Sequence, residues 1–191
     1  MWYLASQSPR RRILLRQLRH PFQVVRSTHR ETIRRDQTPS INAMRNAKGK
    51  AFKAQLPRGA RGLVIGADTF LYFQGRIIGK PRTMAGAFRL LQQLSGRSHW
   101  VYTGLCLWDP TTGHHRISVD KTKVTFQSLT EKTIHQLFTR SSPLDKAGGY
   151  SLQADRGELI AHIDGSRSNV IGLPLERLHK ELALFCRKNT Y

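Results

Sequence analysis

Apolar residues recur at helical spacing in several stretches of the chain, and each such stretch predicts a helix. In residues 83–94 they occupy positions i, i+3, i+4 and i+7 from Ala87 to Leu94, and Gly96 follows as a stop signal. Similar spacing predicts a helix over residues 40–55 and two more that begin at Pro9 and Pro174. Thr130 with Glu131 predicts the start of a helix that reaches about residue 139.

Shorter apolar runs bounded by turn residues predict strands. One run covers residues 63–67 and ends before Asp68, and a Gln-Gly turn separates residues 70–73 from residues 76–78 as in a hairpin. Further strands are predicted over residues 2–5, 22–27, 99–108, 116–123, 124–128 and 158–164. Strands and helices alternate, and no repeat, linker or low-complexity tract divides them, so we expect one domain over residues 1–191.

The composition is that of a folded protein. The 191 residues suffice to bury a sheet and its covering helices, and 39% hydrophobic with 23% charged residues excludes the disordered and fibrous classes. No stretch approaches the roughly 18 continuous apolar residues of a membrane span, and the N-terminal run has no apolar core behind a basic lead. We therefore expect a cytoplasmic protein with no membrane contact.

The charge is strongly positive and unevenly distributed. The chain has 32 Lys and Arg against 12 Asp and Glu, a formal net charge of +20. Residues 1–61 carry 15 basic and 2 acidic side chains (+13), and residues 62–191 carry 17 and 10 (+7). This excess predicts an anionic partner, but charge alone does not distinguish a nucleotide from nucleic acid or an acidic surface.

Cysteine and histidine usage indicates neither disulfides nor a zinc site. Cys106 and Cys186 are far apart and lack a CxxC or CxH pattern, and we expect both to be buried, unreactive thiols. His114 and His115 follow a turn-like sequence without further ligand spacing, which favours a surface turn over a metal site.

The first candidate for chemistry is the sequence SQSPRRR, residues 6–12, between a predicted strand and a predicted helix. Unpaired N–H groups at a helix start, serine hydroxyls and arginine forks all suit phosphate. A plain helix cap, with Ser8 as N-cap and Pro9 in the first turn, explains the same residues. Both interpretations stay open on this motif alone.

Three further segments carry groups that could contact the phosphates or the nucleobase of a nucleotide. Asp68 follows a predicted buried strand, where it could hold a metal, accept a proton or only form a turn. Lys80, after Gly79, could supply a point charge to a phosphate or simply lie in solvent. The loop DKAGGYSLQ, residues 145–153, ends at Gln153, whose amide could read a base edge.

Together these segments resemble, in order and wording, the hallmark blocks of the Maf family of nucleotide pyrophosphatases. The matching blocks are LASQSPRRR at residues 4–12, GADTF at 66–70, GKP at 79–81, LSGRSHWVYTG at 94–104, DKAGGYSLQ at 145–153 and DGSRSNVIGLPLERL at 164–178. The resemblance runs from end to end of the chain. It implies an elongated α/β fold, with a mixed, twisted sheet flanked by helices and two lobes around a central cleft.

The resemblance also implies the activity and its residues. We expect hydrolysis of nucleoside triphosphates to monophosphate and pyrophosphate, with Asp68 as general base or as ligand of a divalent metal cation, Mg²⁺ or Mn²⁺. Glu31 is expected beside Asp68 at the metal. The residues expected to contact the triphosphate are Ser6, Arg10, Arg11, Lys50 and Lys80.

Arg11, Thr69 and Gln153 match the residues that mark the dTTP and UTP branch of the family, and Gln153 could bond the edge shared by thymine and uracil. Two departures from the family pattern bear on affinity: Ser-Thr-His-Arg precedes Glu31, and Ala-Asp-Arg follows Gln153. Clearance of modified or non-canonical nucleotides is one use of such an activity. A basic nucleic-acid-binding protein and a cell-division regulator are the alternatives, and a nucleic-acid contact and a homodimer stay open.

Overall fold

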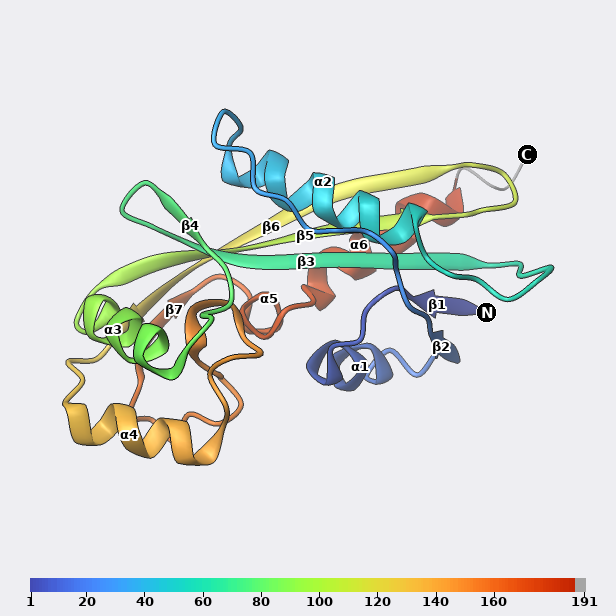
Figure 1. Ribbon diagram of the computed structural model, residues 1–191. Helices are drawn as coiled ribbons and strands as arrows, with labels where there is room; N and C mark the ends of the chain where they lie inside the picture. The colour runs from blue at the N-terminus through green and yellow to red at the C-terminus, as the bar shows by residue number, and fades with distance from the viewer. Residues whose placement is uncertain (188–191) are drawn as a thin grey trace. The chain divides into compact units, whose positions relative to one another are not determined.

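A computed structural model of the chain describes residues 1–187, which form a mixed sheet flanked by helices (Figure 1). The strands are β1 (Trp2–Leu4), β2 (Phe22–Val24), β3 (Leu63–Phe73), β4 (Arg76–Ile78), β5 (Ser98–Trp108), β6 (His115–Phe126) and β7 (Ile160–Asp164). The helices are α1 (Pro9–Arg16), α2 (Pro39–Phe52), α3 (Met84–Leu94), α4 (Glu131–Arg140), the 3₁₀ turn η1 (Ala147–Gly149), α5 (Arg167–Ile171) and α6 (Leu175–Arg187). Over residues 1–187 the sheet has seven strands, in the order β2-β1-β3-β5-β6-β7 with β4 paired to β3. The predicted mixed α/β class is confirmed.

The chain divides into two compact units, each assembled from separate segments. Unit 1 comprises residues 1–68, 103–120 and 172–191, and unit 2 comprises residues 69–102 and 121–171.

In unit 1, α2 packs closely on β3 and β5 at two glycines. A Cβ on Gly66 would lie 2.4 Å from the carbonyl oxygen of Ala47, and one on Gly104 would lie 2.1 Å from that of Ala43. Only a residue without a side chain allows the helix backbone to come so near. Ala47 and Ala51 are buried beside these contacts, so the small residues of α2 set the height of the helix above the sheet. In Figure 1, α1 lies on the other side of the unit 1 strands from α2.

In unit 2, a separate apolar core lies between the sheet and the helices. Alternate residues of the strands point into it, including Leu71 and Phe73 of β3 and Val124 and Phe126 of β6. Leu91 and Leu94 of α3 and Ile134 and Leu137 of α4 complete this core. The helical spacing in the sequence therefore identified Leu91 and Leu94 as residues that α3 buries.

Several predicted boundaries are wrong. Strand β3 continues through Asp68 to Phe73, and β6 is one strand where two were predicted. Asp68 can lie within a buried strand because both of its oxygens receive hydrogen bonds. β2 ends at Val24, α2 ends at Phe52, and η1 and α5 were not predicted because each is too short to show a period.

The two cysteines differ in their surroundings. Cys106 is buried, and burial raises the pKa of its thiol to about 12, against a smaller lowering by Lys48. Cys186 is exposed, so the expectation of two buried thiols is wrong for it. Within residues 1–187, no helix combines the length and the apolar character that a bilayer crossing requires.

Candidate active site

The ends of three parallel strands define one edge of the sheet in unit 1. β1 pairs in parallel with β2 and with β3, and Leu4 lies opposite Val24 on one side and Ile65 on the other. The segment after β1, the segment after β2 and residues 66–68 of β3 therefore meet at this edge. The predicted phosphate-binding motif, the loop that carries Glu31, and Asp68 all belong to these segments.

Asp68 is buried, and each of its carboxylate oxygens accepts a hydrogen bond from a side chain of α2. Lys50 Nζ donates to Oδ1 at 2.7 Å, and Asn46 Nδ2 donates to Oδ2 at 2.9 Å. The two contacts hold the carboxylate in one orientation. A carboxylate has about four lone-pair sites, so two remain for a water molecule.

Glu31 shares the ammonium group of Lys50 with Asp68. Lys50 Nζ lies 2.5 Å from Glu31 Oε1 and 2.7 Å from Asp68 Oδ1. The side chains differ in exposure, at 50% for Glu31, 12% for Lys50 and 7% for Asp68. The three charged side chains thus form a cluster that is buried at Asp68 and exposed to solvent at Glu31.

Side chains of α2 hold the loop that carries Glu31. Asn42, which is buried, accepts from the backbone N–H of Arg34 at 2.8 Å and donates to three backbone carbonyls of the loop. Arg45 Nη2 donates to the carbonyl of Thr32 at 2.8 Å. Asn46 Oδ1 accepts from the N–H of Thr32 at 3.2 Å, so one amide links the loop to Asp68. The position of Glu31 is therefore fixed by the same helix that holds Asp68.

Ser6 and Arg11 form a second buried polar group in unit 1. Arg11 Nη1 donates to Ser6 Oγ at 3.1 Å, and Arg11 Nε donates to the carbonyl of Gly172 at 2.7 Å. Burial lowers the pKa of Arg11, while the negative charges of Asp68 and Glu31 oppose that change and Arg10 adds to it. Arg11 thus lies in the electrostatic field of both carboxylates. Ser8 occupies the N-cap position of α1, but its side chain makes no capping hydrogen bond.

Unit 2 carries the other three predicted contact residues. Thr69 is half-buried in β3, and Lys80 and Gln153 are exposed. Their contact with substrate stays a prediction.

The loop of residues 145–153 is anchored to the unit 2 core by the contact of its partly buried Tyr150 with His99. His99 of β5 is buried, and its Nε2 lies 2.9 Å from the hydroxyl of Tyr150. Both rings also pack edge-on against Phe126. Burial lowers the pKa of His99 to about 4 and raises that of Tyr150, so both groups are neutral at pH 7.

No group of three or more His, Cys, Asp or Glu side chains gathers as a metal site within residues 1–187. The carboxylate pair Glu31 and Asp68 is the set that the sequence predicted, and the two meet at one ammonium.

Comparison with known proteins assigns the chain to a family. The family model described as Maf-like protein matches residues 1–185. The chain belongs to the Maf family. The family therefore covers both units and every predicted site residue of this Maf protein.

Relatives of similar length share a name. A dTTP/UTP pyrophosphatase of Moorella thermoacetica is 41% identical to this Maf protein over 184 residues, which are 95% of this chain and 93% of the relative. Proteins with that name from Bacillus cereus and Bacillus anthracis are 41% and 40% identical over 184 residues, which are 95% of this chain and 88% and 94% of the relatives.

The sequence prediction missed Asn42 and Asn46 of this Maf protein. A signal was present, because Asn42, Asn46 and Lys50 recur every four residues and so lie on one face of α2. The neighbouring stripe of alanines at the same spacing marks the face that packs on the sheet. Polar residues next to a buried stripe therefore pointed to a buried polar network.

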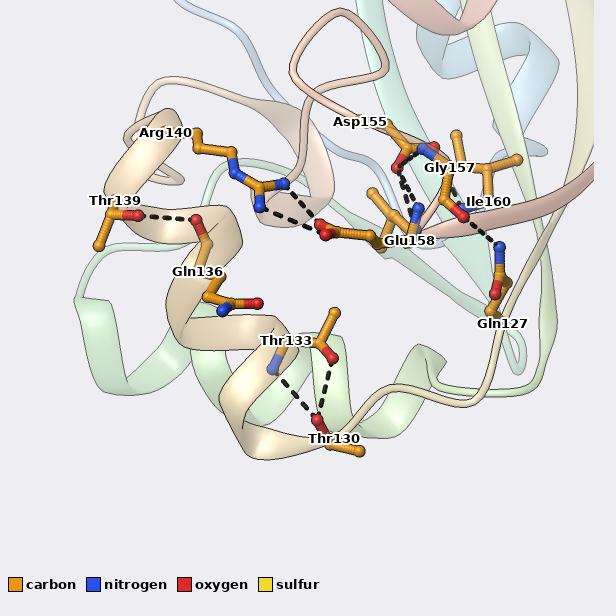
Figure 2. Close-up of polar contacts among 11 residues, drawn as sticks. Gln127, Thr130, Thr133, Gln136, Thr139, Arg140, Asp155, Gly157, Glu158 and Ile160 are labelled. Atoms are coloured by element: carbon orange, nitrogen blue, oxygen red, sulfur yellow. Dashed lines mark hydrogen bonds and ion pairs between the residues drawn. The ribbon is translucent and has the colours of Figure 1, made fainter.

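The two departures from the Maf pattern have structural roles. His29 packs over Gly49, where a Cβ would lie 2.3 Å from the imidazole ring, and its Nε2 lies 3.3 Å from Asn46 Oδ1. The Asp155 carboxylate accepts from the backbone N–H groups of residues 157–160 at 3.0 to 3.3 Å and so shapes the turn before β7 (Figure 2). Arg140 and Glu158 join α4 to this turn, also in Figure 2, and their hydrogen bonds lower the pKa of Glu158. Both substitutions thus stabilise loops.

Proposed function

We propose that this Maf protein hydrolyses nucleoside triphosphates to the nucleoside monophosphate and pyrophosphate, with dTTP and UTP as preferred substrates. The observation that carries the proposal is the meeting of Asp68, Lys50 and Glu31 at one edge of the unit 1 sheet. The shared name of the relatives, which match 95% of the chain, supports the reaction and the substrates.

In this proposal Asp68 is the general base. Its remaining lone pairs orient a water molecule, whose oxygen attacks the α-phosphorus as its proton passes to the carboxylate. The bond between the α-phosphorus and the bridging oxygen breaks, and pyrophosphate leaves with that electron pair. Asn46 holds the carboxylate in one orientation during this step. We assign the substrate phosphates to Ser6, Arg10, Arg11, Lys50 and Lys80, because a triphosphate carries about four negative charges.

The donor set fits a divalent cation. Mg²⁺ usually binds proteins through one or two carboxylates together with substrate phosphates, and Glu31 and Asp68 supply two carboxylates that reach a common point. The same oxygen ligands suit Mn²⁺. When bound there, the cation would neutralise charge on the phosphates.

Base selection is assigned to Gln153. The amide of Gln153 can donate to O4 and accept from N3–H, the two groups that thymine and uracil share. Thr69 and Arg11 complete the set that matches the dTTP and UTP branch of the family.

A panel of canonical and modified nucleoside triphosphates tests the proposal. The protein is incubated with each nucleotide and Mg²⁺ or Mn²⁺, and products are separated by ³¹P NMR. We expect UMP and pyrophosphate from UTP, the corresponding products from dTTP, and none when EDTA removes the cation. Release of orthophosphate and UDP, or equal rates on every nucleotide, would contradict the reaction or the preference, respectively.

A further inference from the structure

One ammonium group lies between the two carboxylates that are proposed to bind the divalent cation. Lys50 Nζ is 2.5 Å from Glu31 Oε1 and 2.7 Å from Asp68 Oδ1. An ammonium carries one positive charge and up to three N–H donors, so it can neutralise and hydrogen-bond both carboxylates together. Lys50 therefore does for these carboxylates what a cation would do.

We propose that Lys50 occupies the place of the divalent cation until substrate binds, and that this exchange couples cation binding to nucleotide binding. The inference rests on the proposed function, because it takes Glu31 and Asp68 as the cation ligands. A divalent cation bonded to both carboxylates and an ammonium at hydrogen-bond distance from the same oxygens exclude each other by repulsion and by space. The cation must displace Lys50 in order to bind.

Nucleotide binding offers the displaced ammonium a new partner. Phosphate oxygens accept hydrogen bonds from lysine as carboxylates do, so Lys50 loses little when it moves from the carboxylates to a phosphate. The cation then binds more tightly with nucleotide present than without it. By thermodynamic linkage, the nucleotide also binds more tightly with the cation present, by the same factor.

The surroundings of Lys50 favour an exchange over a fixed structural ion pair. Glu31 is half exposed and lies on a loop, so a cation can reach its carboxylate from solvent. Asp68 keeps a hydrogen bond from Asn46 when Lys50 leaves, so the buried carboxylate is not left without a donor. The site can therefore lose the ammonium without an unpaired buried charge.

Mn²⁺ binding without nucleotide tests this directly, because free and bound Mn²⁺ give different EPR signals. The Lys50→Met variant removes the competing charge and is expected to bind Mn²⁺ at least about tenfold more tightly than the wild type. The Lys50→Arg variant keeps a cation between the carboxylates and is expected to bind no more tightly than the wild type. The matched control is Lys53→Met, which removes one positive charge from an exposed residue of the same segment and should change affinity less than twofold.

A second titration measures the coupling. With a UTP analogue that cannot be hydrolysed between the α and β phosphates, we expect Mn²⁺ affinity to rise strongly in the wild type and much less in Lys50→Met. Equal or weaker Mn²⁺ binding by Lys50→Met, with its melting temperature near that of the wild type, would overturn the inference. If Lys50→Met is destabilised, Lys50→Gln is tested in its place, and the same increase in Mn²⁺ affinity is expected. Pyrophosphate release by the wild type is scored separately, so the proposed function can fail or hold whatever these titrations give.

Discussion

Each unit buries an ionisable side chain, Asp68 in unit 1 and His99 in unit 2, but the two side chains have different surroundings. In unit 1, both oxygens of the Asp68 carboxylate accept hydrogen bonds from side chains of α2, and the group opens to solvent at Glu31. In unit 2, His99 and Tyr150 are enclosed with Phe126, and burial shifts both pKa values toward the neutral forms. A hydrogen-bonded carboxylate with an exposed neighbour suits ligand binding, whereas a neutral, enclosed pair suits packing. The comparison predicts that unit 1 substitutions change the reaction and that those at the neutral pair change stability.

The largest effect is expected at Asp68. Asp68→Asn removes the base and a cation ligand, and turnover should fall by about 10² or more while the fold stays intact. Pyrophosphate release with UTP measures the loss, and circular dichroism with the melting temperature checks the fold. Asp36→Asn, at an exposed acid of the same unit, is the control and should retain full turnover. Unchanged turnover in Asp68→Asn would remove Asp68 from its role.

The next effect concerns stability and pH at His99. Its pKa is about 4 in the fold, against about 6.5 in an unfolded chain, so between these values the unfolded chain takes up a proton that the native protein does not. Stability should therefore fall as pH drops from about 6.5 to about 4, by about 3 kcal/mol in total. Above pH 6.5, His99 should contribute no pH dependence.

Urea unfolding at pH 7.5 and pH 4.5 checks this effect. The difference between the two pH values should be smaller in His99→Gln than in the wild type, by most of that amount. His179→Gln, at an exposed histidine of α6, is the control and should keep the wild-type difference. The same pH dependence in all three proteins would show that His99 is not held neutral by burial.

The smallest effect is expected at Gln153. Gln153→Glu exchanges an amide that can donate and accept for a carboxylate that only accepts, so kcat/KM for UTP should fall by about tenfold or less. Mn²⁺ affinity should not change, because Gln153 is not a proposed cation ligand. Rates with UTP and with a purine nucleotide distinguish base selection from a general loss. An equal fall with both nucleotides would contradict the assignment.

Much of the fold and of the candidate site could be predicted from the sequence, for physical reasons. The helix α3 was found because its apolar residues repeat every turn and it buries that stripe. The helix α4 was found from its start signal, Thr130 followed by Glu131. Glu31, Lys50 and Asp68 were identified by resemblance, and their contact follows from the parallel pairing of β1 with β3 and the seating of α2 on Gly66. Asn46 was missed because it acts through hydrogen bonds to Thr32 and Asp68, which are distant from it in the sequence. The extent of β3 was missed because an aspartate normally ends a buried strand, and only its tertiary donors allow it to continue.

A crystal structure of the protein with Mn²⁺ and a non-hydrolysable UTP analogue would show whether the cation replaces Lys50 between Glu31 and Asp68. Anomalous scattering would locate the manganese. We expect a manganese peak bonded to oxygens of Glu31 and Asp68, and Lys50 Nζ hydrogen-bonded to a phosphate oxygen. Manganese and triphosphate bound away from these carboxylates, with Lys50 still between Glu31 and Asp68, would contradict it.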